Sequence, residues 1–125
     1  MSGPSPKPAM VLFWVALGAI PGALLRWALA STTLANTLGC FVVGASGLLG
    51  SPPARRTLVL GIGFAGSLTT FSTWVLELLT LTRGGQWGGS LGKLLGDGAL
   101  GVGSVLLGDA LYRGLRKLRE RRLRR

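Results

Sequence analysis

The chain has 125 residues, of which 48% are hydrophobic and 21 are glycine, and its formal net charge is +10. This composition is too apolar and too rich in glycine for an ordinary soluble domain of that size, so it indicates a small membrane protein. One cysteine, no histidine and four carboxylates exclude an intrachain disulfide and a thiol–imidazole metal site, and we predict that the protein is not an enzyme.

Four apolar segments predict an all-α integral membrane protein with four transmembrane helices. A helix of about 20 apolar residues crosses the ~30 Å hydrocarbon core of a bilayer. The segments lie at about residues 9–30, 34–50, 57–81 and 91–112, with a short turn at 51–56 and a loop at 82–89. Spans this closely connected leave no room for a second domain, so we expect residues 1–125 to form one domain.

The first two segments each carry small and polar residues on one helix face. Gly18, Gly22 and Arg26 recur every fourth residue, and Arg26 either reaches the membrane interface or has a packed role. In the second segment Asn36 shares a face with Cys40 and two glycines. An amide in a membrane helix usually links helices, but its NH2 group is also an uncharged donor that could address an anion.

The third segment is unusual, because glycines and hydroxyl residues fill residues 61–74. Gly61, Gly63 and Gly66 lower helix propensity, and the serine and threonine side chains compete for backbone hydrogen bonds. Unpaired backbone groups persist inside a membrane only against protein, water or an ion, so a helix broken here would indicate a site. The alternative is that the small residues simply let helices pack closely.

The side chains of this segment are suited to an anion. Phe71 and Trp74 are three residues apart and share a helix face, beside Ser72 and Thr73. Aromatic ring edges carry partial positive charge, and hydroxyls and amides donate hydrogen bonds. Such a lining replaces part of the hydration shell of a small anion without a fixed cation that would trap it.

The fourth segment carries a ridge of small residues, Gly101, Ser104 and Gly108, with Asp97 and Asp109 near its two ends, where we expect solvation at the membrane interfaces. Most of the net charge follows it, in residues 113–125. A basic tail directly after an apolar span is typical of a cytoplasmic segment held near anionic lipid. The expected partner of the tail is therefore membrane lipid and not nucleic acid.

Three stretches, in this order along the chain, resemble motifs of the Fluc (CrcB-type) fluoride channels. They are GAIPGALLR at residues 18–26, NTLGCFVVG at residues 36–44 and GFAGSLTTFST at residues 63–73. The resemblance implies a channel that exports fluoride passively from the cytoplasm and limits its toxicity. It also implies an antiparallel dimer of four-helix subunits in the cell membrane, with two pores and the third helix broken in mid-membrane.

The resemblance also implies roles for particular residues. The backbone carbonyls of Gly66 and Thr69 would hold a structural sodium ion at the dimer centre, which is required for activity and is not transported. Gly22 and Arg26 belong to the first motif and would be structural. The residues of the fluoride pore would be Asn36, Phe71, Ser72, Thr73, Trp74 and Ser104.

Three positions depart from the family pattern. Trp74 replaces a second phenylalanine, Ser67 replaces a glycine beside Gly66, and Leu100 stands where a tyrosine is common. An alternative function is therefore a non-conducting or partly degraded assembly subunit of a heterodimeric fluoride channel. A proton-coupled small multidrug transporter would need a carboxylate in the first span, and this span has none.

The distribution of cations predicts the orientation. With four spans, Lys7, the turn at 51–56 and the tail lie on one side, which then holds 11 of the 14 Lys and Arg residues; Arg26, Arg83 and Lys93 make up the other three. This bias predicts that both termini are cytoplasmic. A subunit with fixed orientation needs an oppositely oriented paralogue as partner, whereas tail charges synthesised too late to dominate would leave a dual-topology homodimer. The sequence leaves both open.

Overall fold

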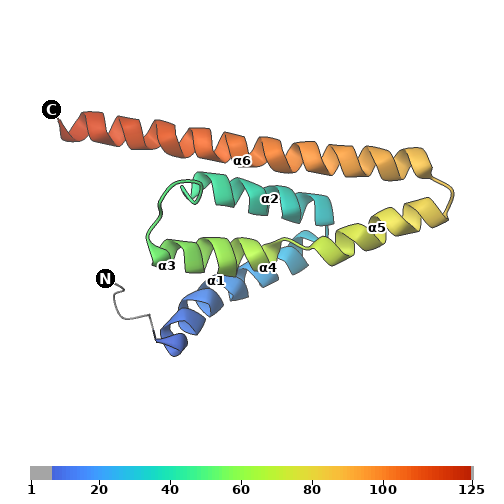
Figure 1. The fold of residues 1–125 in the computed structure, drawn as a ribbon, viewed down its shortest axis with the longest axis horizontal. Coiled ribbons are helices and arrows are strands. Elements are labelled where there is room, and N and C mark those ends of the chain that lie inside the picture. The colour runs from blue at the N-terminus through green and yellow to red at the C-terminus, as the bar shows by residue number, and fades with distance from the viewer. Residues whose placement is uncertain (1–6, 125) are drawn as a thin grey trace.

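The computed structural model describes residues 7–124, and every regular element in that part of the chain is helical. The elements are α1 (Pro8–Leu29), α2 (Thr32–Ala45), α3 (Ala54–Arg56), η1 (Thr57–Ala65), α4 (Gly66–Leu68), α5 (Phe71–Arg83) and α6 (Trp87–Leu123). No gap separates α3, η1 and α4, which form one rod with a wider, π-helical middle (Figure 1). The prediction of an all-helical, four-span fold is confirmed.

Three helical stretches are long and apolar enough to cross a membrane: Pro8–Leu29, Ala54–Arg83 and Trp87–Leu123. The helix α2 is apolar but shorter, and it ends at Ala45, before the predicted boundary at residue 50. The chain turns there because Gly47 adopts a φ of +69°, and a Cβ atom at this position would lie 2.6 Å from Cε1 of Tyr112. Only glycine combines that backbone conformation with such close contact.

The predicted fourth span and basic tail form one continuous helix. With 37 residues, α6 is about 55 Å long, which exceeds the ~30 Å hydrocarbon core, so its basic end extends past the apolar part. Ion pairs one turn apart support it, at 2.7 Å from Arg113 Nε to Asp109 and 3.0 Å from Arg116 Nε to Glu120. The predicted loop at 82–89 shortens to residues 84–86.

Close backbone contacts replace a large side-chain core. A Cβ atom on Gly63 of η1 would lie 2.5 Å from the Val15 carbonyl oxygen of α1, and one on Gly108 of α6 would lie 2.5 Å from the Phe41 carbonyl oxygen of α2. The buried hydrophobic residues are Ala35, Ala65 and Leu68. Most large apolar side chains point outward, as they do in a protein whose surroundings are lipid or another subunit.

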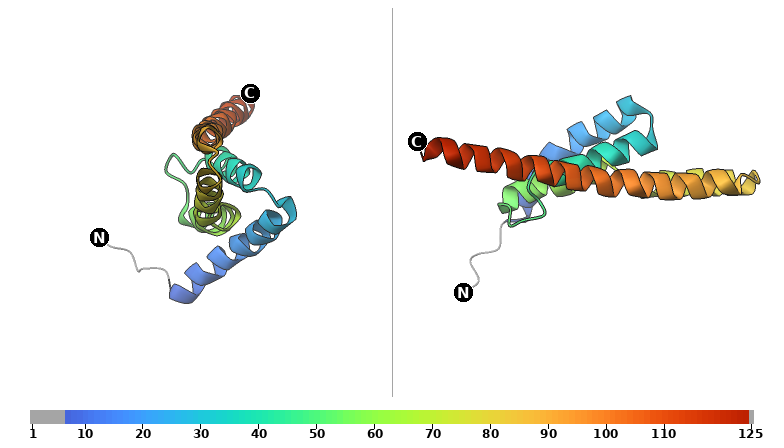
Figure 2. Two further views of the ribbon diagram at one scale, coloured as in Figure 1. Left: turned by 90° about the vertical axis from the view of Figure 1, so that its right-hand side faces the viewer. Right: turned by 90° about the horizontal axis from the view of Figure 1, so that it is seen from above.

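The helix α1 packs against the broken rod, the rod packs against α2, and α2 packs against α6. Figure 2 shows this end-on, with α1 and α6 on opposite sides of the other helices. In Figure 1 the start of α1, the α2–α3 loop and the end of α6 lie toward one end of the molecule, and the α1–α2 and α5–α6 connections lie toward the other.

Candidate functional site

The helical rod breaks between Leu68 and Phe71, inside the apolar stretch that runs from Ala54 to Arg83. Thr69 and Thr70 are both extended there, with φ and ψ of −79° and 153° and of −145° and 121°. The predicted interruption of the third helix is therefore present, and these two threonines form it.

The side chain of Asn36 on α2 bonds to the backbone at the helix break. Its Nδ2 donates to the Thr70 carbonyl oxygen at 3.1 Å, and the Thr70 N–H donates to its Oδ1 at 2.7 Å. A single side-chain amide thus satisfies both backbone groups of one residue, as another peptide unit would. The structure places Asn36 as an interhelical link, and one N–H of its NH2 group remains for a further acceptor.

The break removes the usual donors from two carbonyl oxygens. In an unbroken helix the N–H of residue i bonds to the carbonyl of residue i−4. Here the Thr70 N–H bonds to Asn36 instead of Gly66 O, and the Thr73 N–H bonds to Thr70 Oγ1 at 3.4 Å instead of Thr69 O. Gly66 and Thr69 are the two residues whose carbonyls the family resemblance implies for sodium, and carbonyl oxygens suit a hard cation.

Gly66 has an ordinary helical conformation, with φ of −63° and ψ of −34°, and it precedes the turn. It is exposed, and a Cβ atom there would make only a van der Waals contact, 3.6 Å from the Gly61 carbonyl oxygen. The fold of one subunit therefore does not require glycine at this position. A residue with an open side in the middle of an apolar stretch faces either lipid or a neighbouring subunit.

The aromatic residues of α5 lie in an open groove against α2 and α6. Phe71 is 75% exposed, and its ring centroid is 5.7 Å from that of Trp74. The groove has a volume of about 490 Å³, and its lining residues are Asn36, Cys40, Thr69, Thr70, Phe71, Trp74, Asp97, Gly98, Gly101, Val102 and Val105. Ser104 is half-buried on α6, next to Val105. The structure thus brings Asn36, Phe71 and Trp74 to one groove, and their role in a fluoride pore stays a prediction.

Ser72 and Thr73 lie in a different groove, on the side of α5 that faces the α1–α2 turn. This second groove has a volume of about 660 Å³, and its polar lining includes Arg26, Thr32 and Glu77. Successive helical residues point about 100° apart, which separates these hydroxyls from the aromatic pair. The six predicted pore residues are therefore not all in one groove of a single subunit. Arg26 is exposed here, whereas Gly22, on the same helix, is buried.

The remaining departures from the family pattern have local roles or face outward. Ser67 Oγ donates to the Phe64 carbonyl oxygen at 3.1 Å, within the same turn of the rod. Leu100 is 49% exposed on α6. Neither residue brings a new polar group into the grooves beside α5.

A charged cluster that the sequence analysis missed lies beside Trp74. Lys93 Nζ is 2.9 Å from carboxylate oxygens of Glu77 and Asp97 and also 2.9 Å from Thr33 Oγ1. Asp97 was expected to be solvated at an interface, and this is wrong. Its side chain is only 14% exposed because it packs among bonding partners on α2, α5 and α6. The i, i+4 spacing of Lys93 and Asp97 was the available signal.

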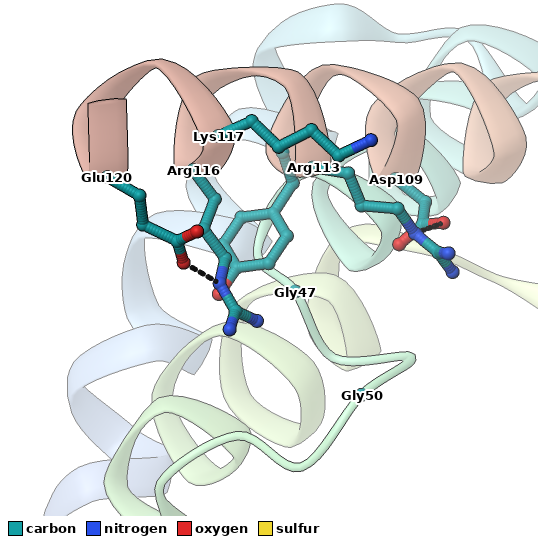
Figure 3. Close-up of a pocket in the computed structure, with 8 residues that line it drawn as sticks. Gly47, Gly50, Asp109, Arg113, Arg116, Lys117 and Glu120 are labelled. Carbon is teal, nitrogen blue, oxygen red and sulfur yellow. Dashed lines mark hydrogen bonds and ion pairs between the residues drawn. The ribbon is translucent and has the colours of Figure 1, made fainter. Parts of the chain in front are cut away.

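A separate hollow lies at the basic end of α6 (Figure 3). Its cations Arg113 and Arg116 are paired with the carboxylates of Asp109 and Glu120. Arg56 Nη1 donates to Tyr112 Oη at 3.4 Å and to the Ser46 carbonyl oxygen at 3.3 Å. These bonds tie the α2–α3 loop to α6, so the hollow is a structural junction, far along α6 from the helix break.

The sequence of the chain is similar to those of known proteins. The sequence model of the family described as "CrcB-like protein, Camphor Resistance (CrcB)" matches residues 13–109. The chain is 47% identical over 111 residues to "Fluoride-specific ion channel FluC 2" of Parasynechococcus marenigrum (strain WH8102), covering 84% of this chain and 83% of that protein. It is 43% identical over 124 residues to the protein of the same name from Synechococcus sp. (strain CC9605), covering 90% and 92%.

A more distant relative is "Fluoride-specific ion channel FluC 1" of Thermobifida fusca (strain YX). It is 37% identical over 114 residues, and the match covers 81% of this chain and 94% of that protein. The matches therefore cover 83% to 94% of the length of these relatives, which share the name fluoride-specific ion channel. Together with the apolar helices, these matches show that the chain is a multi-pass membrane protein and belongs to the CrcB-like protein family.

Proposed function

We propose that this protein is a fluoride channel through which fluoride leaves the cytoplasm passively, so that its toxicity is limited. The observation that carries the proposal is the broken third helix, which exposes Phe71 beside Trp74 and Asn36 in one groove. Ring edges and amide or hydroxyl donors offer a small anion weak, multiple contacts. The identity of up to 47% to relatives named fluoride-specific ion channels supports the same ion.

The pathway needs a second subunit. In one subunit Phe71 is 75% exposed and the groove beside it is open, so ions there would meet lipid. An antiparallel dimer would cover both grooves with partner side chains and create two pores. It would also bring the exposed Gly66 of each subunit toward the dimer centre, where two rods without interfering Cβ atoms can approach closely.

The same dimer centre suits a structural sodium ion. Its ligands would be the carbonyl oxygens of Gly66 and Thr69 from both subunits, because the break has taken away their helical donors. When bound, the ion would neutralise converging carbonyl dipoles and so hold two subunits together. The chain contributes the extended Thr69–Thr70 turn and the Asn36 link that keeps it extended.

The partner is a copy of this chain or a paralogue in the opposite orientation. The bias of 11 to three cations favours cytoplasmic termini and therefore a paralogue. A relative named FluC 2 occurs in Prochlorococcus marinus (strain MIT 9313), and one named FluC 1 occurs in strain NATL2A of the same species. A second candidate function, a non-conducting subunit of such a pair, is favoured by one observation: the Asp97 carboxylate lines the same groove as Phe71.

Fluoride efflux from liposomes tests the proposal. Vesicles with purified protein, loaded with fluoride or with chloride, are monitored by ion electrodes after the membrane potential is clamped. We expect fast loss of fluoride and retention of chloride, and slower fluoride loss when protein and vesicles are prepared without sodium. Activity only in the presence of a paralogue would establish the heterodimer. If fluoride flux is absent both from the protein alone and from the protein with a paralogue, the channel function is contradicted.

Labelling of a single cysteine tests the orientation. The cysteine is added after the basic end in a Cys40→Ala background, and an impermeant maleimide is applied to cells and to inverted vesicles. Labelling only in inverted vesicles is expected for cytoplasmic termini. Equal labelling from both faces in a cell without a paralogue indicates the dual-topology homodimer.

A further inference from the structure

The indole N–H of Trp74 is bonded to a carboxylate that lines the same groove. Trp74 Nε1 donates to Asp97 Oδ2 at 2.9 Å, across the contact between α5 and α6. The Trp74 ring remains beside Phe71, with 39° between the two ring planes. Both aromatic residues thus line the groove, while the one side-chain donor of the tryptophan is bonded to Asp97.

We propose that Asp97 is a positioning residue for ion passage, which keeps the Trp74 indole N–H bonded and so unavailable to a passing fluoride ion. This inference rests on the proposed function. An indole N–H is a pure donor, and in a water-poor groove an unpaired donor binds an anion strongly. Because conduction requires an ion to leave as easily as it enters, a free N–H at this point would slow transport. Phenylalanine has no such group, so only tryptophan needs an acceptor here.

The surroundings of Asp97 keep its charge from opposing an anion. Lys93 Nζ lies 2.9 Å from Oδ2, and Thr33 Oγ1 donates to Oδ1 at 2.9 Å. Together with the indole, three donors from three helices surround one carboxylate, whose side chain is only 14% exposed. Glu77 shares the same lysine and accepts from Thr32, but the indole N–H donates to Asp97 and not to Glu77. Asp97 and Glu77 therefore make a matched pair for mutation.

A double-mutant cycle tests the inference. In the tryptophan-containing chain, D97A should slow fluoride efflux by about tenfold, the effect of exposing one donor that a charged acceptor had bound. In the W74F background, D97A should change the efflux rate no further, whatever rate W74F itself sets. The control is E77Q, which disturbs the same lysine without touching the indole. Its effect should be the same in both backgrounds.

Two flux results would overturn the inference. One is an unchanged rate in D97A with Trp74 present. The other is an equal loss from D97A in both backgrounds, because Asp97 would then act through Lys93 or on the ion directly. Either result leaves fluoride conduction by the unmutated chain intact. The proposed function fails separately, if the unmutated chain conducts neither alone nor with a paralogue.

An NMR measurement on the Trp74 indole tests the inference in variants that do not conduct fluoride. Phenylalanine replaces Trp14, Trp27 and Trp87, so that the Trp74 indole gives the one ¹⁵N–¹H indole signal. D97A should move this signal toward that of a free indole and speed its exchange with solvent, whereas E77Q should leave it in place. An unmoved signal in D97A contradicts the positioning role even in a chain without measurable flux.

Discussion

The helix break and the cluster of Glu77, Lys93 and Asp97 both put polar groups among apolar helices, but they satisfy these groups differently. At the break, a neutral amide takes the backbone groups of Thr70 and leaves the carbonyls of Gly66 and Thr69 without their helical donors. In the cluster, charges and hydroxyls bond to one another. A site that must receive an ion keeps acceptors available, whereas a site that positions helices uses them up.

The largest effect is expected at Asn36. Asn36→Ala leaves both the N–H and the carbonyl of Thr70 without a partner, at a cost of about 1–3 kcal/mol for each group. Both the yield of folded protein and the fluoride flux should fall, and size-exclusion chromatography with efflux assays measures both. Asn36→Asp keeps an acceptor for the N–H and should be intermediate. Normal yield with lost flux in Asn36→Ala would instead make this side chain an ion contact.

The next effect separates the ion path from the fold. Phe71 is 75% exposed and its ring contacts Trp74, so Phe71→Ile should leave the yield near normal. Fluoride flux should fall by about tenfold or more, because isoleucine retains apolar bulk but lacks the polarised ring edge. Liposome efflux normalised to reconstituted protein gives the comparison. Full flux in this variant would reduce Phe71 to a packing residue.

Two glycines offer the same substitution in opposite surroundings. Gly63→Ala places a Cβ atom 2.5 Å from the Val15 carbonyl oxygen and should destabilise the subunit by about 2–3 kcal/mol. Gly66→Ala meets only an ordinary contact at 3.6 Å, so the subunit should fold normally while dimerisation and sodium dependence weaken. Thermal unfolding in detergent and cross-linking of dimers distinguish the two effects. Equal losses of subunit stability would show that Gly66 serves the fold of one chain.

Local sequence patterns predicted most of the fold and part of the site. The glycines and hydroxyls of residues 61–74 predicted the break, because weak helix propensity and competing hydrogen bonds act within one turn. The partner of the break was not predictable from spacing, since Asn36 and Thr70 are 34 residues apart. The early end of α2 depends in the same way on the Tyr112 ring against Gly47.

The charged cluster shows the same limit. Lys93 and Asp97 have the spacing of a helical ion pair, but Glu77 and Thr33 join them only through tertiary packing. The family resemblance implied that Ser72 and Thr73 belong to a pore with Phe71; in one subunit they line a different groove, and their pore role stays a prediction. Tertiary packing, which spacing along the chain does not encode, therefore decides which groove each residue lines.

The smallest effect is expected at Thr69, where the proposed ligand is backbone. Thr69 Oγ1 already donates to the Ala65 carbonyl oxygen at 2.9 Å, so the hydroxyl serves its own turn. Thr69→Ser keeps that bond and the carbonyl, and Thr69→Val keeps the carbonyl and the methyl that packs on Gly39. Both variants should retain the sodium dependence of flux within about threefold, the scale of one neutral hydrogen bond. The measurement is efflux against sodium concentration during preparation.

Thr69→Val is the sharper variant of the two. If sodium dependence disappears in Thr69→Val and persists in Thr69→Ser, the hydroxyl is a ligand and the carbonyl assignment is wrong. If both retain it, the ion depends on a feature that no side-chain substitution at this position removes. That feature is the extended turn itself, with ψ of 153° at Thr69, which Asn36 maintains from α2. The sodium dependence should then be lost most completely in Asn36→Ala, although no atom of Asn36 needs to touch the ion.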